Sequence, residues 1–320
     1  MATPRKYKDG RERQKAYRTR KARSIRNAEA LRNDKQLITI ERPALRYYGG
    51  KWRIASWIIE QFPAHTCYVE PFGGGASVLL QKQPSKFEVL NDLDNKVINF
   101  FDVLRSTPEQ LIRAILLTPY SREELRRART SPSTDDPVEN ARRFYVLCWQ
   151  SYGSGTGKTS TGWRYQIGAG DNSRASAIGS FNDTEHLWLV ADRLKQVQIE
   201  HDDAYKVIQR FDSSETLFYL DYPYVHSTRY HSSSDKGYAF EMTDDDHRRF
   251  AHLVNNIRGM AMVSGYPSRL YDELYAGWKC ISRQSQDING KGKTECLWMS
   301  PRTAENARLP LFEGITNAND

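Results

Sequence analysis

The stretch TCYVEPFGGGASVLLQK at residues 66–82, with FEVLNDLDN at residues 87–95 after it, decides the fold. An apolar strand predicted at 67–70 runs into three glycines and then into a predicted helix. A second apolar strand at 87–90 leads to acidic residues and to another predicted helix, from Val97 to Leu104. Strand, helix, strand, helix in this order is typical of a parallel sheet with right-handed crossovers, so we expect an α/β fold.

The same alternation returns in the last third of the chain. Strands are predicted at the start of VQIEHDDAYKVIQRF (197–211), in TLFYL (216–220) and in MAMVSG (260–265), with two final strands within 278–286 and 295–301. Thr243 and Asp246 resemble a capping box at the start of a helix that precedes the strand at 260. Ahead of the first strand, residues 51–61 have the apolar spacing of an amphipathic helix. Residues 107–195 break this rhythm, and we interpret them as an insertion.

The N-terminal arm, residues 1–33, carries most of the positive charge. It has twelve Lys and Arg against three Asp and Glu, a net charge of +9, whereas the whole chain has +8 and the remainder is therefore close to neutral. Its few apolar residues cannot bury enough surface for the arm to fold alone. A polyanion is its natural partner, and about eight to ten phosphate contacts would give binding a salt slope on the order of −7 to −9. A solvated or localising tail is the alternative.

Composition excludes several classes of protein. No run approaches the roughly 18 apolar residues of a membrane span, and the N-terminus has no apolar core that could act as a secretory signal. Cys67, Cys148, Cys280 and Cys296 form no CxxC pair, which favours reduced thiols. The seven histidines lack the spacing of metal ligands. We therefore expect a soluble, cytoplasmic protein without a membrane or metal partner.

The glycine turn is the first candidate site. Gly73, Gly74 and Gly75 let the backbone approach a ligand closely, and the N–H groups of the following helix are expected to point outward, which suits an anionic or zwitterionic cofactor. Asp92, about 17 residues after the last glycine, could bind ribose hydroxyls. The turn does not match the GxGxxG dinucleotide fingerprint, and a purely structural turn is the better explanation of this pair when it is taken alone.

The second candidate site follows the apolar strand at 216–220, which ends in Asp221-Tyr222-Pro223-Tyr224. An acidic side chain at the carboxyl end of a central parallel strand lies where open α/β sheets bind ligands. A carboxylate and a backbone carbonyl can accept both hydrogens of an exocyclic amine, while an adjacent aromatic ring stacks on a flat heterocycle. The pattern therefore predicts a pocket for an aminopurine or aminopyrimidine.

YYGGK at 47–51, VEPFGGGAS at 69–77, NDLDN at 91–95 and DYPY at 221–224, in this order, resemble the DNA adenine-N6 methyltransferases whose recognition region precedes the catalytic tetrapeptide. The resemblance extends from about residue 42 to about residue 301. It implies a Rossmann-like class I methyltransferase fold with a mixed sheet. It also implies a catalytic domain (41–106 and 196–320) that is interrupted by a target-recognition insertion (107–195). The basic arm lies outside the resemblance, and we predict it to be a DNA-binding arm (1–40), helical or disordered. The arm is similar to leader segments of phage-encoded members, and restriction-modification is a further setting in which such enzymes act.

The resemblance also implies a chemistry for named residues. S-adenosylmethionine is the implied methyl donor, and double-stranded DNA the implied partner. Lys51 would face the methionine end of the donor and Asp92 its ribose, and Asp202 competes with Asp203 for the position near its adenine. Asp221 and the carbonyl of Tyr222 would hold the target amine. The implied donor site consists of Tyr48, Gly49, Gly50, Lys51, Glu70, Pro71, Phe72, Gly73, Gly75, Asp92 and Asp203, and the implied catalytic residues are Asp221, Tyr222, Pro223 and Tyr224.

Tyr222 departs from the family pattern, which has proline at this position. The backbone carbonyl survives the change, but the fixed φ of proline is lost and a bulky ring must be housed. One alternative is therefore a catalytically weakened DNA-binding protein in which replacing Tyr222 with proline raises activity. Cytosine-N4 methylation and an RNA or small-molecule methyltransferase are further alternatives. The sequence indicates neither the recognition site nor the oligomeric state.

GSGTGKT at 153–159 resembles a phosphate-binding P-loop, but the spacing of its glycines does not fit, so we exclude a nucleoside triphosphatase. A loop rich in Gly, Ser and Thr between aromatic and basic residues instead suits contact with DNA phosphates. For Trp149 we expect packing beneath the loop rather than DNA contact. The predicted DNA-binding residues are Arg11, Arg18, Lys21, Lys158 and Arg164.

Overall fold

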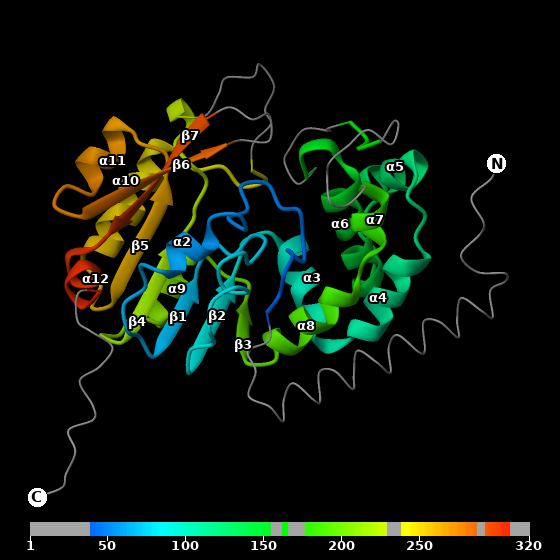
Figure 1. Ribbon diagram of the computed structural model, residues 1–320, viewed down its shortest axis with the longest axis horizontal. Coiled ribbons are helices and arrows are strands. Elements are labelled where there is room, and N and C mark those ends of the chain that lie inside the picture. Colours follow the sequence, from blue (N-terminus) through cyan, green and yellow to red (C-terminus); the bar gives the residue numbers. More distant parts are fainter. Residues whose placement is uncertain (1–38, 155–161, 166–176, 229–237, 287–291, 308–320) are drawn as a thin grey trace, which may run out of the picture.

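The computed structural model describes residues 39–154, 162–165, 177–228, 238–286 and 292–307 (Figure 1). In this part of the chain a seven-stranded sheet has the order β3-β2-β1-β4-β5-β7-β6. The first five strands are parallel, and β7 runs antiparallel to both β5 and β6. Each strand overlaps a predicted stretch, although β7 begins three residues earlier than predicted, and the mixed sheet is confirmed. The strands are β1 Cys67–Glu70, β2 Phe87–Asn91, β3 Val197–Glu200, β4 Thr216–Leu220, β5 Met260–Gly265, β6 Lys279–Gln286 and β7 Gly292–Met299.

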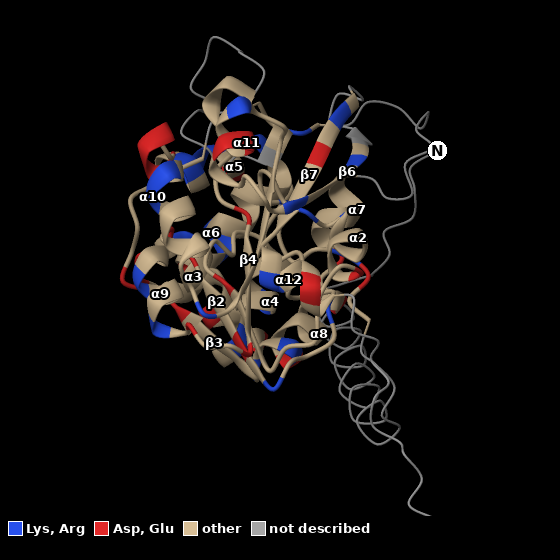
Figure 2. Cartoon of the chain, turned by 90° about the vertical axis from the view of Figure 1, so that its left-hand side faces the viewer, with Lys and Arg blue, Asp and Glu red and all other residues tan. Residues whose placement is uncertain are grey.

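Successive side chains along each strand point to opposite faces of the sheet. Both faces are buried in a hydrophobic core. In β4, Leu217 and Tyr219 join the core on one face, while Phe218 and Leu220 join the core on the other. The second core also contains apolar residues of α9 Ala204–Arg210, α10 Asp244–Asn255 and α11 Arg269–Leu274. Figure 2 shows charged residues on α9 and α10, whereas the central strand β4 carries no charged residue. The predicted capping box of Thr243 and Asp246 is confirmed at the start of α10.

The opposite face packs against a group of helices that lies beside the sheet in Figure 1. α3 Asn95–Ser106 follows β2 directly and packs against α6 and α8, so that apolar residues of these helices share one core with the sheet. The region predicted to be an insertion is therefore helical where it is described. Its helices are α4 Pro108–Leu117, α5 Arg122–Thr130, α6 Pro137–Gln150, α7 Ala177–Asn182 and α8 Glu185–Leu194.

A buried ion cluster connects these helices to the sheet. Glu88 in β2 is only 1% exposed, and its carboxylate accepts hydrogen bonds from Lys82 Nζ at 2.6 Å and from Arg193 Nη2 of α8 at 2.8 Å. Burial alone would raise the pKa of Glu88, but the two cations lower it below its usual value. Since a buried charge is costly without partners, this cluster fixes α8 against the edge of β2.

Two sequence-based helix predictions need correction. Residues 77–82 form turns and a bend rather than a helix. The N–H of Leu79 donates to the carboxylate of Glu70 at 2.7 Å, and the N–H of Leu80 donates to the carbonyl of Ala76 at 3.0 Å. Ala76 also has a positive φ of 52°, which an L-residue adopts only at some cost. The helix predicted over 51–61 is reduced to α2 Ala55–Ile59.

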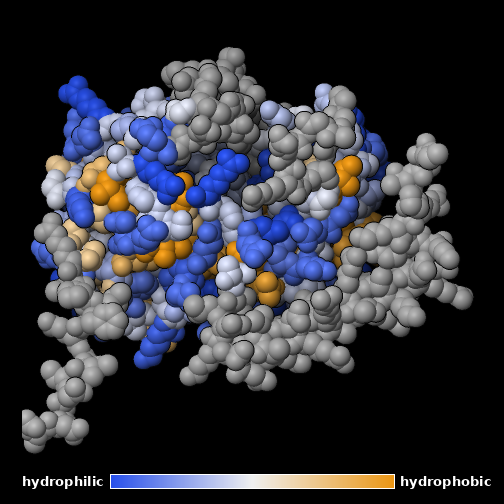
Figure 3. All heavy atoms as spheres, viewed as in Figure 1, coloured by the Kyte–Doolittle hydropathy of each residue, from blue (hydrophilic) through white to orange (hydrophobic). Residues whose placement is uncertain are grey.

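The surface is mostly hydrophilic, with smaller apolar patches on the face drawn in Figure 3. In the described part of the chain, no helix combines the length and apolar character that crossing a bilayer requires. The four cysteines, all within the described ranges, are free thiols. α12 Pro301–Asn306 follows β7 and closes the described C-terminal end of the fold. The basic arm lies outside the described residues.

Candidate functional site

A cavity of about 370 Å³, open to solvent, lies at the carboxyl ends of β1 and β4. This edge is where parallel α/β sheets bind ligands. The cavity brings together the YYGGK segment, the glycine turn and the start of the DYPY segment, as the sequence predicted. It is lined by Tyr47, Tyr48, Gly49, Gly50, Lys51, Glu70, Phe72, Gly73, Gly74, Gly75, Ser77, Val78, Tyr219, Asp221 and Tyr238.

The glycine turn is fixed by its own surroundings. Gly73 N–H donates to the carbonyl of Asn91 and Gly74 N–H to Asp92 Oδ2, both at 2.7 Å. These two N–H groups are therefore already paired within the protein. A Cβ on Gly73 would overlap Leu90, and one on Gly75 would come within 3.0 Å of the Tyr47 side chain, so both positions require glycine for packing.

Asp92 lies beside the cavity rather than in its lining. Its Oδ1 accepts the N–H of Asp94 at 2.8 Å, while its Oδ2 binds Gly74 as described above. Burial raises the pKa of Asp92 to about 6, against the lowering effect of these hydrogen bonds. Each carboxylate oxygen has a second lone pair, so the group can still accept hydrogen bonds from a hydroxyl.

Lys51 and Asp221 form an ion pair at the centre of the site, with Lys51 Nζ 2.8 Å from Asp221 Oδ1. Nζ also donates to the carbonyl of Gly49 at 2.7 Å, and Ser264 Oγ donates to Asp221 Oδ1 at 2.8 Å. Burial alone would lower the pKa of Lys51, but the carboxylates of Asp221 and Glu295 raise it above its usual value. Lys51 is therefore a charged ammonium that keeps Asp221 in hydrogen-bonding position.

Glu70 is a second buried carboxyl group in the cavity wall, only 2% exposed. Its Oε1 accepts hydrogen bonds from the Tyr68 hydroxyl and the Leu79 N–H, both at 2.7 Å. Burial raises the pKa of Glu70 to about 7. The cavity wall therefore holds both a cation, Lys51, and a carboxyl group, Glu70, whose pKa lies near neutral pH.

Tyr222 points away from the cavity. Asp221 continues the alternation of Leu217 and Tyr219, whereas Tyr222 continues that of Phe218 and Leu220 and enters the core on the other face. Its ring is fully buried among the rings of Phe72, His247, Phe250 and Tyr271, and its hydroxyl pairs with that of Tyr275. The bulky ring is thus housed without entering the site.

Tyr224 returns to the site side. Lys51 Nζ lies 4.7 Å from the centre of its ring, and the Tyr266 ring meets it edge-on at 4.6 Å. The Tyr224 hydroxyl donates to Glu295 Oε2 at 2.9 Å. The acidic acceptor, the ammonium and an oriented aromatic ring therefore lie together at the end of β4.

Comparison with known proteins assigns this arrangement to a family. A family model described as D12 class N6 adenine-specific DNA methyltransferase matches residues 47–287. The chain belongs to this family. The enzyme is 24% identical to the type II methyltransferase M1.LlaDCHI of Lactococcus lactis subsp. cremoris over 78% of this chain and 89% of that protein. It is also 24% identical to the DNA adenine methylase of Salmonella typhi over 79% of this chain and 91% of that protein.

An rRNA methylase of known structure from Streptococcus thermophilus aligns with a TM-score of only 0.28, at 9% identity over 77% of this chain and 93% of its own. The fold assignment therefore rests on the strand order and the family. The predicted resemblance is confirmed, and with it the enzyme class: the protein is a DNA methyltransferase that acts on N6 of adenine. This favours adenine over the cytosine-N4 alternative.

The remaining predicted residues of the methyltransferase lie around the cavity or outside the described chain. Asp203 caps α9 by accepting the Tyr205 N–H at 2.8 Å, and Asp202 pairs with Arg210 at 2.7 Å, so neither lines the cavity. Pro71 lies behind it, where its carbonyl accepts from Asn91 Nδ2 at 2.9 Å. Pro223, between Tyr222 and Tyr224, is half-buried.

The predicted DNA-binding residues are described only at Arg164. Arg11, Arg18, Lys21 and Lys158 lie outside the described residues. Arg164 is half-buried, and its backbone carbonyl accepts a hydrogen bond from the Tyr120 hydroxyl. Trp149 is only 4% exposed and donates to the Ala44 carbonyl at 3.2 Å, which confirms that it packs in the core.

Sequence reasoning missed several residues of the site. Tyr47, Ser77 and Tyr238 line the cavity, Ser264 binds Asp221, and Glu295 binds Tyr224. The signal for Glu295 is the direction of its strand: an antiparallel strand brings its first residues to the edge where parallel strands end. Among the described residues, no group of three His, Cys, Asp or Glu side chains is placed to hold a metal ion.

Proposed function

We propose that the enzyme transfers a methyl group from S-adenosylmethionine to N6 of an adenine that is flipped out of double-stranded DNA and held by Asp221. The observation that supports this proposal is the position of Asp221 at the end of β4, beside a cavity bounded by the glycine turn. Its carboxylate, the aromatic ring of Tyr224 and the ammonium of Lys51 lie within one site.

The chemistry of the cavity fits a zwitterionic donor with a ribose. Lys51 suits the donor carboxylate, and Glu70 suits its ammonium group, because both side chains line the cavity and are buried. Asp92, beside Gly74, is placed at the end of β2 to accept ribose hydroxyls. The walls of the donor site are formed by Tyr48, Gly49, Gly50, Phe72, Gly73 and Gly75. We assign Asp203, which follows β3, to the adenine of the donor. When bound, the donor supplies an activated methyl group on a sulfonium centre.

The protein must make a poor nucleophile react. The lone pair of an aryl amine is delocalised into the ring, and two acceptors on its hydrogens hold it toward tetrahedral geometry. Asp221 and the backbone carbonyl of Tyr222 are the assigned acceptors, with Pro223 completing the turn. As positive charge develops on the amine, the Asp221 carboxylate stabilises it. No covalent intermediate with the enzyme is required.

The base must leave the duplex to reach this site. Extrusion costs a few kcal/mol, which stacking on Tyr224 and contacts to the DNA backbone offset. We assign recognition of the DNA to the helical region 107–195, and non-specific attraction to the arm at 1–40, whose positive charge suits phosphates. Arg164, Lys158 and the arm residues Arg11, Arg18 and Lys21 are the candidate contacts. We assign the reaction to the cytoplasm of a bacterial or phage-infected cell.

Replacing Asp221 with asparagine tests the proposal. The variant Asp221→Asn keeps the shape but removes the negative charge, so methyl transfer to duplex DNA should fall by about 10²–10³-fold or more. The dissociation constant of S-adenosylmethionine, measured by calorimetry, should change by less than about threefold. The exposed Asp135→Asn is the matched control and should behave as wild type. Activity of Asp221→Asn within tenfold of wild type would contradict the proposed role.

The nature of the product requires a second measurement. Wild-type enzyme is incubated with S-adenosylmethionine and either a duplex plasmid or the same sequence as single strands, and modified bases are mapped. N6-methyladenine at defined duplex sites is expected. Preferential modification of single strands would contradict duplex recognition, and absence of donor binding in the titration would contradict the assignment of the cavity.

A further inference from the structure

Glu295 is a buried carboxyl group that belongs to none of the four motifs. It lies in β7, it is 8% exposed, and it is more than seventy residues away from Asp221 in the sequence. Burial raises the pKa of Glu295 above its usual value, so that its position costs free energy. A carboxyl group placed at such a cost beside an active site calls for a reason.

The topology explains how Glu295 reaches the site. β7 is antiparallel to β5 with Gly265 opposite Cys296, so the first half of β7 lies at the edge where β4 and β5 end. Along β7, Glu295 alternates with Cys296 and points to the same face as Leu297. This is also the face of Asp221, which faces the cavity.

The contact of Glu295 is specific. Its Oε2 accepts a hydrogen bond of 2.9 Å from the Tyr224 hydroxyl, an atom at the far end of the ring. Tyr266 touches the same ring edge-on at 4.6 Å, and Lys51 Nζ lies 4.7 Å from its centre. A tyrosine ring pivots about two torsions, so fixing its hydroxyl end in addition to these two ring contacts leaves a single orientation.

A role in charge balance alone is the alternative. Lys51, Lys293 and Asp221 are the charged groups that act on Glu295, and Lys51 is already paired with Asp221 at 2.8 Å. Lys293 Nζ reaches the Tyr266 hydroxyl at 3.1 Å and lies over its ring at 4.5 Å. The ammonium groups thus have their own partners, and the shortest contact of Glu295 is the tyrosine hydroxyl.

We propose that Glu295 is a positioning residue that fixes the Tyr224 ring in the orientation that stacks on the flipped adenine. This inference rests on the proposed function, since it assigns the base-stacking role to Tyr224. Glu295 touches neither substrate nor donor in this role. Its effect passes through one hydrogen bond, which makes the two residues energetically dependent on each other.

A double-mutant cycle tests this dependence. Tyr224→Phe removes the hydroxyl but keeps the ring, and Glu295→Leu removes the acceptor. Each single change should lower kcat/KM for duplex DNA by about tenfold, the size expected for losing one hydrogen bond to a charged group. The double variant should lose about tenfold as well, rather than the hundredfold that independent effects give. Glu295→Gln, which keeps an acceptor oxygen, should recover most of the loss.

Two readouts separate positioning from simple destabilisation. A duplex with 2-aminopurine at the target base reports extrusion, and its fluorescence increase on binding should be smaller in Tyr224→Phe and Glu295→Leu than in wild type. The calorimetric dissociation constant of S-adenosylmethionine should be unchanged in both. Melting temperatures and active-site titration with the donor correct the rates for any loss of folded enzyme.

The outcomes are distinct. The positioning role would be overturned if the two losses in kcat/KM multiply in the double variant. It would also be overturned if the single variants give a normal 2-aminopurine signal and only their melting temperatures are lowered; Glu295 would then be a structural group. If wild type methylates duplex adenine and Asp221→Asn does not, such a result leaves the proposed function intact. If wild type itself forms no N6-methyladenine, the proposed function fails first.

Discussion

Tyr222 stands next to the proposed amine acceptor, yet its ring belongs to the core on the opposite face of the sheet. The period-two alternation along β4 carries Asp221 to one side and Tyr222 to the other, so the motif keeps its backbone carbonyl at the site whichever side chain follows. The bulky residue is therefore compatible with an active site. What proline would remove is a large, fully buried ring.

Replacing Tyr222 with proline is therefore expected to destabilise the enzyme instead of activating it. Loss of the ring leaves a cavity among Phe72, His247 and Phe250, and truncation of buried aromatic side chains costs about 3–5 kcal/mol. Urea unfolding of Tyr222→Pro should show this loss, while Tyr222→Phe, which keeps the ring, should lose much less. A Tyr222→Pro variant that is as stable as wild type and more active would refute this account and favour a wild-type enzyme weakened by its tyrosine.

Donor affinity should depend on pH through Asp92. Because its folded pKa is raised to about 6, the carboxylate form that accepts ribose hydroxyls is lost as pH falls through 6. Affinity for S-adenosylmethionine should then fall by about tenfold per pH unit below that value. Stability moves the other way: a raised acid pKa stabilises the fold at low pH, and this contribution is lost as pH rises through about 6.

Calorimetric titrations between pH 5 and 8 measure this dependence. Glu70 also lines the cavity and titrates near 7, so the two groups must be separated. Asp92→Asn should bind more weakly at pH 7.5 and lose the step near 6, whereas Glu70→Gln should keep it. A step near 6 that persists in Asp92→Asn would assign the titration to another group.

The cavity residues could be predicted from sequence wherever they follow a parallel strand. The glycines and Asp221 could be predicted because strand ends and turns are local signals, whereas Lys51 precedes the first strand and was implied only by the family resemblance. All of them line one cavity. Ser264 and Glu295 were missed because their closeness to Asp221 depends on how β5 and β7 pair, which no local pattern contains. The roles of all these residues stay predictions until they are tested.

At the scale of elements, strands were predicted better than helices. The central strands β1, β2, β4 and β5 are short and largely apolar, so that pattern and structure agree there. Turns replace the helix predicted after the glycine turn, and the N–H of Leu79 there donates to the side chain of Glu70. A side chain that competes for a backbone amide is invisible to an apolar periodicity.

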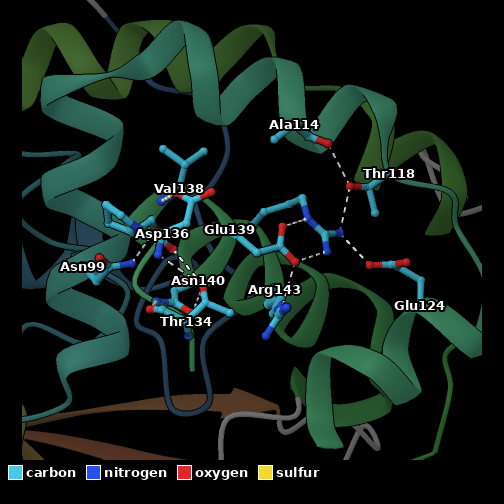
Figure 4. Close-up of polar contacts among 12 residues, drawn as sticks. Asn99, Ala114, Thr118, Glu124, Thr134, Asp136, Val138, Glu139, Asn140 and Arg143 are labelled. Atoms are coloured by element: carbon cyan, nitrogen blue, oxygen red, sulfur yellow. Dashed lines mark hydrogen bonds and ion pairs between the residues drawn. The ribbon is translucent and has the colours of Figure 1, made fainter. Parts of the chain in front are cut away.

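One arginine connects three helical elements of the region 107–195. Arg142 in α6 binds Glu139 at 2.6 Å, and it reaches Glu124 of α5 at 2.6 Å and Thr118 after α4 at 3.0 Å. Figure 4 shows Thr118, Glu124 and Glu139 converging from these three elements. Glu124 and Thr118 are both buried, so they have few other partners within the described structure.

Arg142→Met should therefore loosen these helices. Removing the arginine leaves the buried Glu124 without its cation, a change that costs about 3 kcal/mol in buried pairs. Urea unfolding measures the loss, and adding Glu124→Gln to the variant should recover part of it. Arg126→Met, which breaks an exposed pair with Glu123, is the matched control and should leave stability unchanged. Equal effects of the two variants would mean that burial of the network does not matter.

For the whole molecule, the sheet and the helical region share one core. α3 follows β2 and packs against α6 and α8, while Arg193 of α8 binds Glu88 in β2. The boundaries predicted at 107 and 195 therefore separate parts of the chain to which we assign different roles. They do not separate two hydrophobic cores. A loss of stability from Arg142→Met should consequently appear as a shift of one cooperative transition, with no early partial unfolding.

The arm provides the remaining whole-molecule prediction, because its charge of +9 exceeds the net charge of the entire chain. In the full chain, the plot of log affinity for duplex DNA against log salt concentration should have a slope on the order of −7 to −9 if most of these charges meet phosphates. Deleting residues 1–33 should make this slope less steep. Donor affinity should not change, since the cavity is lined by residues from Tyr47 onward. Deleting residues 308–320, which carry little charge, controls for truncation. The slope is proportional to the number of phosphates that the protein neutralises, whatever their base sequence. The difference in slope between the full chain and the deletion variant therefore gives the number of phosphates that the arm contacts, and an unchanged slope would mean that it contacts none.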